Sequence, residues 1–273
     1  MVSRNEFVNT LVDLIMKAET ELSKDVLEVI KKAEKEEEYE IAKVVLQTII
    51  KNVEVALERR IPICQDTGIL VFFLDVGIDA KYNFDIYDAI REATRIATKE
   101  VPLRPNAVHP ITRVNSGDNT GIYVPVVHTS VVEGDEIKVT VMPKGAGSEN
   151  VSKLMMLLPG EVEKIPEYVV EVIRNAGGKP CPPVFVGVGI GGTFDECAVL
   201  SKKALLRDVR YMNDFERKIL DMLNSLNIGP MGLGGKTTAL SVLVETAHCH
   251  TASLPLAINV QCWANRRAST ILG

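Results

Sequence analysis

Three consecutive side chains, Cys64, Gln65 and Asp66, could together perform chemistry. Pro62 precedes them and a Thr-Gly pair follows, a composition that favours a short, rigid loop. The loop would present a thiolate ligand beside an ionisable carboxylate, which suits a metal or cluster site with an acid or base next to it. The alternative is a buried structural cysteine at the start of a strand, because free cysteine is among the most buried residue types.

Two further cysteines lie in similarly constrained positions. Cys181 stands between Pro180 and Pro182, which fix the backbone and limit regular hydrogen bonding. Cys262 follows a predicted strand. Three thiolates would suit a [4Fe-4S] cluster that leaves one iron open to a substrate. The wide separation of the three cysteines in the sequence excludes a local ferredoxin-like run.

A zinc site is the main alternative to a cluster. His248 and His250 flank Cys249, and mixed Cys/His sets are typical zinc ligands. Cys249 is therefore ambiguous at this point. Cys197 lies inside a predicted helix between apolar residues, so we expect it in the core.

Polar groups for an anionic substrate are also available. Arg104 lies in an irregular stretch and could bind a carboxylate with two hydrogen bonds, or form an ordinary surface ion pair. His250 could orient or protonate a substrate, or serve a structural role. Gly147, just before a predicted helix, could offer its backbone N–H to a carboxylate, or mark a simple turn.

Two glycine-rich stretches invite a nucleotide interpretation. The stretch at residues 187–192 matches G-x-G-x-x-G, but helix follows helix after it, without the expected βαβ continuation. The stretch at residues 229–237 resembles a phosphate loop, yet Pro230 replaces a required glycine and the flanking elements are reversed. Neither supports a nucleotide site, although the second loop could bind an anion through backbone N–H groups and Lys236.

Composition limits the class of protein. The 273 residues are 46% hydrophobic and 25% charged, as in an ordinary globular protein with a substantial core. The net charge of −5 and the dispersed basic residues argue against nucleic acid as a partner. We find no signal peptide and no membrane-spanning run, so we expect no membrane partner and a cytoplasmic location. The five cysteines are an odd number, which disfavours a disulfide framework.

Periodicity predicts an α+β fold, in which an N-terminal helical region precedes a mixed, largely antiparallel sheet region flanked by helices. We expect one domain, residues 1–273, with a helical lobe at 1–59 and a cluster-binding region at 60–273. Strands at 123–132 and 136–142 should form a hairpin, and a helix should begin near residue 151. Further helices are predicted at residues 85–100, 165–175, 194–207 and 211–226, and further strands at 69–76, 184–188, 237–244 and 256–260.

Six blocks in order resemble one known family, the α subunit of class I fumarate hydratases and the similar L(+)-tartrate dehydratases. Any one block is a modest signal, but six in order are specific. The resemblance covers residues 60 to 267. The blocks are Pro62-Ile63-Cys64-Gln65-Asp66-Thr67-Gly68, Gly117-Asp118-Asn119-Thr120-Gly121, Lys144-Gly145-Ala146-Gly147-Ser148-Glu149-Asn150, Cys181-Pro182-Pro183, Gly187-Val188-Gly189-Ile190-Gly191-Gly192-Thr193 and Gln261-Cys262-Trp263-Ala264.

The resemblance implies a cofactor and a set of site residues. It implies a [4Fe-4S] cluster held by Cys64, Cys181 and Cys262, with Cys197 and Cys249 outside the ligand set. It implies substrate contacts from Gln65, Asp66, Arg104, Gly147 and His250, of which Gln65, Asp66 and His250 would be catalytic. The residues after the third cysteine, Asn265-Arg266-Arg267, differ from the family pattern, so no role is carried over to them.

The resemblance also implies an activity and a partner. A separate β subunit would supply the rest of the active site, including the catalytic base, in an α2β2 assembly. The expected reaction on a small dicarboxylate is the reversible hydration of fumarate to L-malate. One alternative is dehydration of L(+)-tartrate to oxaloacetate by the same chemistry. Another, of a different class, is a zinc- or anion-binding protein without enzymatic activity.

Overall fold

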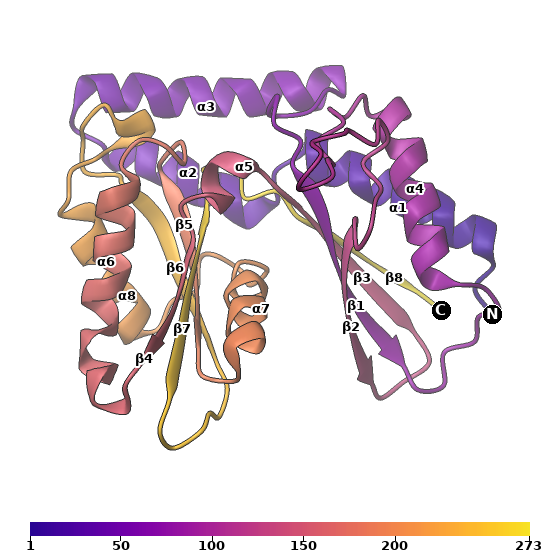
Figure 1. Ribbon diagram of the computed structural model, residues 1–273. Coiled ribbons are helices and arrows are strands. Elements are labelled where there is room, and N and C mark those ends of the chain that lie inside the picture. Colours follow the sequence, from indigo (N-terminus) through magenta and orange to yellow (C-terminus); the bar gives the residue numbers. More distant parts are fainter. The chain divides into compact units, whose positions relative to one another are not determined.

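The computed structural model describes residues 1–273 and divides into two compact units (Figure 1). Unit 1 comprises Met1–Ser23, Asn52–Gly145 and Arg266–Gly273, and unit 2 comprises Lys24–Lys51 and Ala146–Asn265. The helices within residues 1–59 are divided between the two units instead of forming a lobe of their own. None of the helices is both long enough and apolar enough to cross a membrane.

Unit 1 is a four-stranded sheet in the order β2-β1-β3-β8, packed against two helices. Its strands are β1 (Ile69–Gly77), β2 (Val126–Val132), β3 (Ile137–Lys144) and β8 (Ala268–Leu272), and its helices are α1 (Arg4–Thr20) and α4 (Ile86–Glu100). The apolar residues of α1 at helical spacing, among them Leu11 and Ile15, are fully buried in the core that this helix shares with α4 and the sheet. Burial of this apolar face stabilises the unit.

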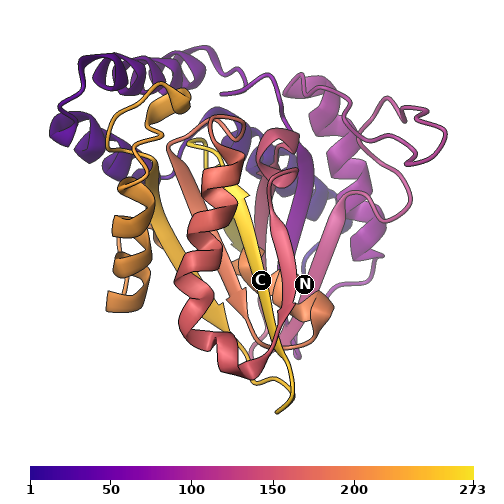
Figure 2. The same cartoon turned by 60° about the vertical axis from the view of Figure 1, so that its left-hand side comes forward.

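Unit 2 is a second four-stranded sheet in the order β4-β7-β5-β6, with helices on both faces. Its strands are β4 (Lys153–Leu157), β5 (Val184–Ile190), β6 (Ala239–Thr246) and β7 (Leu254–Gln261). Figure 2 shows α6 in front of this sheet. The helices are α2 (Lys24–Glu36), α5 (Ala146–Glu149), α6 (Ile165–Ala176), α7 (Phe194–Ala204) and α8 (Asp214–Asn224), with 3-10 helices η1 (Pro159–Lys164) and η2 (Pro230–Gly232).

The α+β prediction is confirmed. Each sheet contains one parallel pair, β1–β2 or β5–β6, and two antiparallel pairs. Helices α4, α6, α7 and α8 and strands β1, β5, β6 and β7 all form within a few residues of the predicted ranges. The helical region expected at residues 1–59 ends with the long helix α3 (Glu40–Arg59), whose residues belong to unit 2 up to Lys51 and to unit 1 from Asn52.

The predicted hairpin of residues 123–142 is wrong. Strands β2 and β3 do not pair with each other, because β1 lies between them, parallel to β2 and antiparallel to β3. Strand β1 is nearly all buried and apolar, so the central position removes most surface from water. The connecting loop crosses the end of β1, where Gly77 N–H donates to the Glu136 carbonyl at 2.9 Å.

The helix predicted from residue 151 is also wrong. The helical turn comes earlier, as the short α5, and residues 153–157 form β4, which pairs antiparallel with β7. A short apolar run does not distinguish strand from helix by periodicity, and here the side of β7 that does not pair with β5 supplies the backbone partners.

The glycines of the G-x-G-x-x-G stretch allow a helix to approach a strand. A Cβ at Gly187 would lie 2.1 Å from the Ser201 carbonyl oxygen, and one at Gly189 would lie 2.2 Å from that of Cys197. Strand β5 therefore packs directly on α7 through these two positions. Their role is contact between elements, which explains the motif without a dinucleotide.

The loop that resembles a phosphate loop binds an anion that belongs to the chain itself. Glu37 is 4% exposed, and its carboxylate accepts hydrogen bonds from the Thr237 hydroxyl at 2.8 Å and from the backbone N–H groups of Thr237 and Lys236. Burial alone would raise the pKa of Glu37, but these hydrogen bonds and one from the Tyr39 N–H hold that pKa below its usual range. Glu37 thus occupies the position of the anion that we expected from outside.

We predict that Glu37→Gln lowers the free energy of unfolding at pH 7 by about 1–3 kcal/mol, because an amide cannot replace all the charge-assisted bonds. Since the folded-state pKa of Glu37 is depressed, its contribution is present above the unfolded-state pKa near 4.5 and disappears as the pH falls through the folded-state value. Urea unfolding at several pH values measures both effects. Glu38→Gln, whose side chain is 90% exposed, is the control and should change neither.

Candidate functional site

The Cys64 loop, residues 62–68, leads directly into β1 and lies entirely in unit 1. Gly68 has a φ of +74°, and a Cβ there would lie 2.6 Å from the Lys144 backbone of β3. Only glycine fits both the backbone conformation and this close approach. The Thr-Gly turn inferred from the sequence is therefore the point at which the loop is pressed against the sheet.

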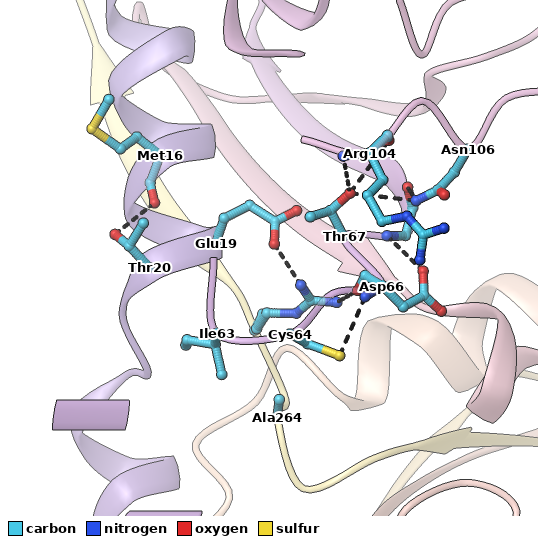
Figure 3. Close-up of polar contacts among 12 residues, drawn as sticks. Met16, Glu19, Thr20, Ile63, Cys64, Asp66, Thr67, Arg104, Asn106 and Ala264 are labelled. Carbon is cyan, nitrogen blue, oxygen red and sulfur yellow. Dashed lines mark hydrogen bonds and ion pairs between the residues drawn. The ribbon is translucent and has the colours of Figure 1, made fainter. Parts of the chain in front are cut away.

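Thr67 fastens this loop to the segment that carries Arg104 (Figure 3). Its side chain is buried, and its hydroxyl oxygen accepts the Arg104 backbone N–H at 3.1 Å and the Asn106 side-chain amide at 3.3 Å. The same amide donates to the Gly68 carbonyl at 3.2 Å. These bonds hold the Arg104 segment and the Cys64 loop together without any strand pairing.

Asn119 provides a second fastening from within the Gly-Asp-Asn-Thr-Gly block. It is 4% exposed, and its amide donates to the Arg104 carbonyl at 3.0 Å while its oxygen accepts the Asn106 N–H at 2.6 Å. Its φ of +60° is a left-handed conformation, which asparagine tolerates better than most residues. The backbone on both sides of Arg104 is thereby fixed.

Gln65 and Arg104 present their polar groups outward from this fixed backbone. Both residues are exposed, and the Arg104 guanidinium forms no ion pair, so the alternative of a surface salt bridge does not apply. The Asp66 carboxylate is oriented by the Gly68 N–H, which donates to Oδ1 at 3.0 Å. The Asp66 N–H in turn points at the Cys64 sulfur, 3.4 Å away. An amide, a carboxylate, a thiol and a guanidinium thus belong to one braced substructure.

A buried ion pair contacts the backbone of the Cys64 loop. Glu19 and Arg266 are 0% and 1% exposed, and Arg266 Nη1 lies 2.5 Å from Glu19 Oε2. Arg266 Nη2 donates to the Asp66 carbonyl at 2.8 Å. Burial raises the pKa of Glu19 to about 7, although the neighbouring Arg266 opposes this shift.

Cys181 and Cys262 lie at one end of the unit 2 sheet, next to the ends of its two central strands. Cys181 precedes β5 and Cys262 follows β7, and these strands are antiparallel with Phe185 opposite Gln261. The two loops also meet directly, because the Trp263 N–H donates to the Cys181 carbonyl at 3.4 Å. Both cysteines are at least partly exposed. The antiparallel register therefore brings together two cysteines that are far apart in the sequence.

Gly147 lies near the same end of the sheet. It is an exposed residue of α5, and a Cβ at its position would lie 3.5 Å from the Lys179 carbonyl, two residues before Cys181. The segment after α5 is tied to β7 by the Ser152 hydroxyl, which accepts the Val260 N–H at 3.0 Å. A backbone N–H donor and two thiols are thus grouped within unit 2.

His250 lies at the opposite end of that sheet, in the direction of the strands. It belongs to the loop between β6 and β7, whereas Cys262 follows the far end of β7, and the eight-residue strand spans roughly 23 Å. Figures 1 and 2 both show the β6–β7 loop at the lower end of the sheet. The imidazole is exposed, and its Nδ1 accepts the Ala252 N–H at 3.1 Å, which leaves the proton of the neutral ring on Nε2.

The other two cysteines have separate environments. Burial raises the pKa of the Cys197 thiol to about 11, and this thiol donates to the Gly189 carbonyl at 3.1 Å. Cys249 lies in the β6–β7 loop, where its thiol donates to the Ser253 carbonyl. Neither unit contains a group of three or more Cys, His, Asp or Glu side chains placed to hold a metal ion, so the Cys/His zinc site around Cys249 has no support from the geometry.

Sequence reasoning missed four residues that position the site: Thr67, Asn119, Glu19 and Arg266. Thr67 and Asn119 were inside family blocks but carry no motif for a fastening role. Glu19 gave no signal, because a glutamate in an amphipathic helix is normally solvated. Arg266 was noticed only as a departure from the family pattern.

Comparisons with known proteins agree with the resemblance. The family model described as "Fumarate hydratase (Fumerase)" matches residues 8–271. A protein of Methanocaldococcus jannaschii, provisionally named L(+)-tartrate dehydratase subunit alpha, is 47% identical over 271 residues, which are 95% of each chain. The L(+)-tartrate dehydratase subunits alpha of Escherichia coli O157:H7 and strain K12 are 33% and 32% identical over 282 residues, 99% of this chain and 93% of each relative.

We predict that Thr67→Val loosens the Arg104 segment locally, at a cost of about 1–3 kcal/mol, because the Arg104 N–H and the Asn106 amide lose a buried acceptor. Native-state amide hydrogen exchange at Arg104 measures this loss as faster exchange. Thr67→Ser keeps the hydroxyl and should exchange nearly as slowly as the native chain. Equal protection in both variants would contradict the fastening role.

Proposed function

Because this chain belongs to the fumarate hydratase (Fumerase) family and is a hydro-lyase, we propose that it is the α subunit of an iron–sulfur enzyme that removes water from a small hydroxylated dicarboxylate. In such a reaction a C–O bond breaks at one carbon, a C–H bond breaks at its neighbour, and water leaves as a C=C bond forms. The observation that carries the proposal is the braced loop that presents Cys64, Gln65 and Asp66 together with Arg104.

We place L(+)-tartrate first among substrates and fumarate/L-malate second. The relatives that cover nearly the whole chain are named for tartrate dehydratase, whereas the family model is named for fumarate hydratase. The order reverses our expectation from the sequence. The chemistry is the same for both acids, but dehydration of tartrate gives an enol that becomes oxaloacetate. Assays of the purified αβ complex with both acids decide between them by the ratio of their kcat/KM values.

We propose that Cys64, Cys181 and Cys262 hold a [4Fe-4S] cluster. The donor set fits, because these three cysteines are at least partly exposed and lie on loops at strand ends, whereas Cys197 is buried with a raised pKa and Cys249 lies at the other end of its sheet. When bound, such a cluster supplies one iron without a protein ligand, a Lewis acid toward a substrate hydroxyl and carboxylate.

The chain's own residues would bind and orient the acid. The Arg104 guanidinium matches a carboxylate in shape and charge and is exposed on a fixed backbone. The Gln65 amide, exposed next to Cys64, can donate to a carboxylate or accept from a hydroxyl. The Asp66 carboxylate would hold the proton of the departing hydroxyl or of the attacking water. The Gly147 N–H would offer a further donor to a carboxylate.

We propose that the His250 of a second α chain completes the site. Within one unit 2 the sheet separates His250 from Cys181 and Cys262, so a histidine of the same unit does not reach a substrate bound at these thiols. An α2β2 assembly, which we expect from the family resemblance, contains a second copy that can supply it. Its Nε2–H would donate to the substrate.

A β subunit would contribute the remaining groups, including the base that removes the C–H proton. The names of the relatives identify them as alpha subunits. The chain also exposes large apolar side chains in the loop after Arg104: Ile111, Val114, Ile122 and Tyr123 are 85%, 68%, 81% and 89% exposed. A surface of this kind is typical of protein interfaces.

We predict that Cys64→Ser, Cys181→Ser and Cys262→Ser each abolish the iron–sulfur absorbance of the anaerobically reconstituted αβ complex and lower kcat by more than about 100-fold, since each removes a thiolate. Cys197→Ser and Cys249→Ser are matched controls and should keep both iron and activity. Full iron content and activity in any of the first three variants, or stoichiometric zinc in the native protein, would overturn the cluster proposal.

We also predict complementation between two inactive α variants. Co-expression of His250→Asn and Cys262→Ser chains with β should restore about a quarter of native activity, because half of randomly mixed pairs contain one site with both native residues. Each variant alone should remain near background. Absence of recovery in isolated mixed complexes that contain a normal cluster would assign His250 to its own chain or to no site.

A further inference from the structure

The buried pair of Glu19 and Arg266 lies outside every role assigned above, and it contacts the Cys64 loop from below. We propose that this pair is a positioning device for the reaction: it fixes the backbone of the Cys64 loop and thereby sets the directions in which Cys64, Gln65 and Asp66 point. The inference rests on the proposed function for its catalytic consequence, but its structural part can be tested without it.

The contacts bracket the reactive residues on both sides. The Ile63 N–H donates to the Glu19 backbone carbonyl at 2.8 Å, just before Cys64. Arg266 Nη2 donates to the Asp66 carbonyl at 2.8 Å, two residues after Cys64. Figure 3 shows Glu19 next to the segment that carries Cys64 and Asp66. The backbone of the loop is therefore held at two points that flank the thiol.

The side chain of Glu19 acts through Arg266. Its carboxylate bonds Nη1 of the guanidinium, while Nη2 of the same planar group carries the bond to Asp66. A guanidinium can serve two partners in fixed directions, which the single ammonium of a lysine does not reproduce. Removing the carboxylate would leave a buried positive charge without its counterion, so Arg266 depends on Glu19 for its position.

The Asp66 side chain is confined by the same arrangement. A Cβ added at Gly145 would lie 3.0 Å from Asp66 Oδ2 and 4.0 Å from Arg266 Nη2, so backbone from the end of β3 closes on the carboxylate. With Oδ1 held by the Gly68 N–H, the carboxylate has little room to turn. A shift of the Asp66 carbonyl would therefore be passed to its carboxylate.

Stability alone does not account for such a pair. A buried ion pair can usually be replaced by apolar side chains of similar size without loss of stability. Here both side chains are buried in unit 1, Glu19 at the end of α1 and Arg266 just before β8. A buried charge pair that is hydrogen-bonded to a loop with reactive groups can fix the geometry of that loop.

The test is the double variant Glu19→Leu/Arg266→Met in the full αβ complex. We expect an unfolding midpoint close to native, but faster amide exchange at residues 64–66, faster loss of cluster iron to a chelator, and a kcat lower by about 10–100-fold with a much smaller change in KM. Arg266→Lys should show most of the same defect, because the three rotatable donors of an ammonium do not hold two partners in the fixed directions of a planar guanidinium.

Arg207→Met is the matched control. Arg207 also joins a buried glutamate, Glu216, to a backbone carbonyl, that of Val244, but it lies in unit 2. It should lower stability while exchange at residues 64–66, iron retention and kcat stay native. Equal behaviour of the double variant and the native complex in exchange, iron loss and kcat would overturn the positioning role.

Failure of the proposed function gives a different result. A native complex without activity on tartrate, malate or fumarate would reject the proposed reaction, yet the double variant would still show faster exchange at residues 64–66 if the pair holds the loop. Native-like exchange in the double variant rejects the positioning role whatever the substrate is.

Discussion

The backbone of the Cys64 loop is held by side chains and by a single helix carbonyl, not by a ladder of backbone hydrogen bonds. Polar backbone groups that are removed from water need hydrogen bonds, and a loop between α3 and β1 has no ladder to supply them. In this protein Asn52 donates to the Ile63 carbonyl at 2.9 Å and Arg266 donates to the Asp66 carbonyl at 2.8 Å, while the Glu19 carbonyl accepts the Ile63 N–H at 2.8 Å. Everything that the loop presents outward follows from this inner set of bonds.

The unit 2 sheet imposes a second constraint through its strand directions. Because β5 and β7 are antiparallel, the start of one and the end of the other meet, and Cys181 and Cys262 become neighbours. Because of the same strand directions, the β6–β7 loop with His250 lies at the opposite end of the sheet. The strand pairing thus brings together Cys181 and Cys262, two proposed cluster ligands, and separates them from His250, a proposed substrate-binding residue. For this reason we propose that the histidine comes from a second chain.

Two glycine-rich stretches show how a motif can describe packing instead of ligand binding. Gly187 and Gly189 are small because α7 touches β5 at these positions, and a side chain would collide with helix carbonyls. The 229–237 loop surrounds the Glu37 carboxylate, which an isolated sequence pattern does not distinguish from a bound phosphate. The first motif reflects the close approach of a helix to a strand, and the second, which was expected to bind an anion, binds an anionic side chain of the same chain.

The sequence by itself determined most helices and strands, the α+β class and the residues capable of chemistry, because periodicity and turn residues are local properties. It did not determine that β1 separates β2 from β3, since pairing depends on which strand gains most from a central, buried position. Nor did it determine the roles of Glu19, Arg266 and Thr67. Those roles arise from contacts between residues as far apart as 247 positions, and only the tertiary structure brings such residues within hydrogen-bonding distance.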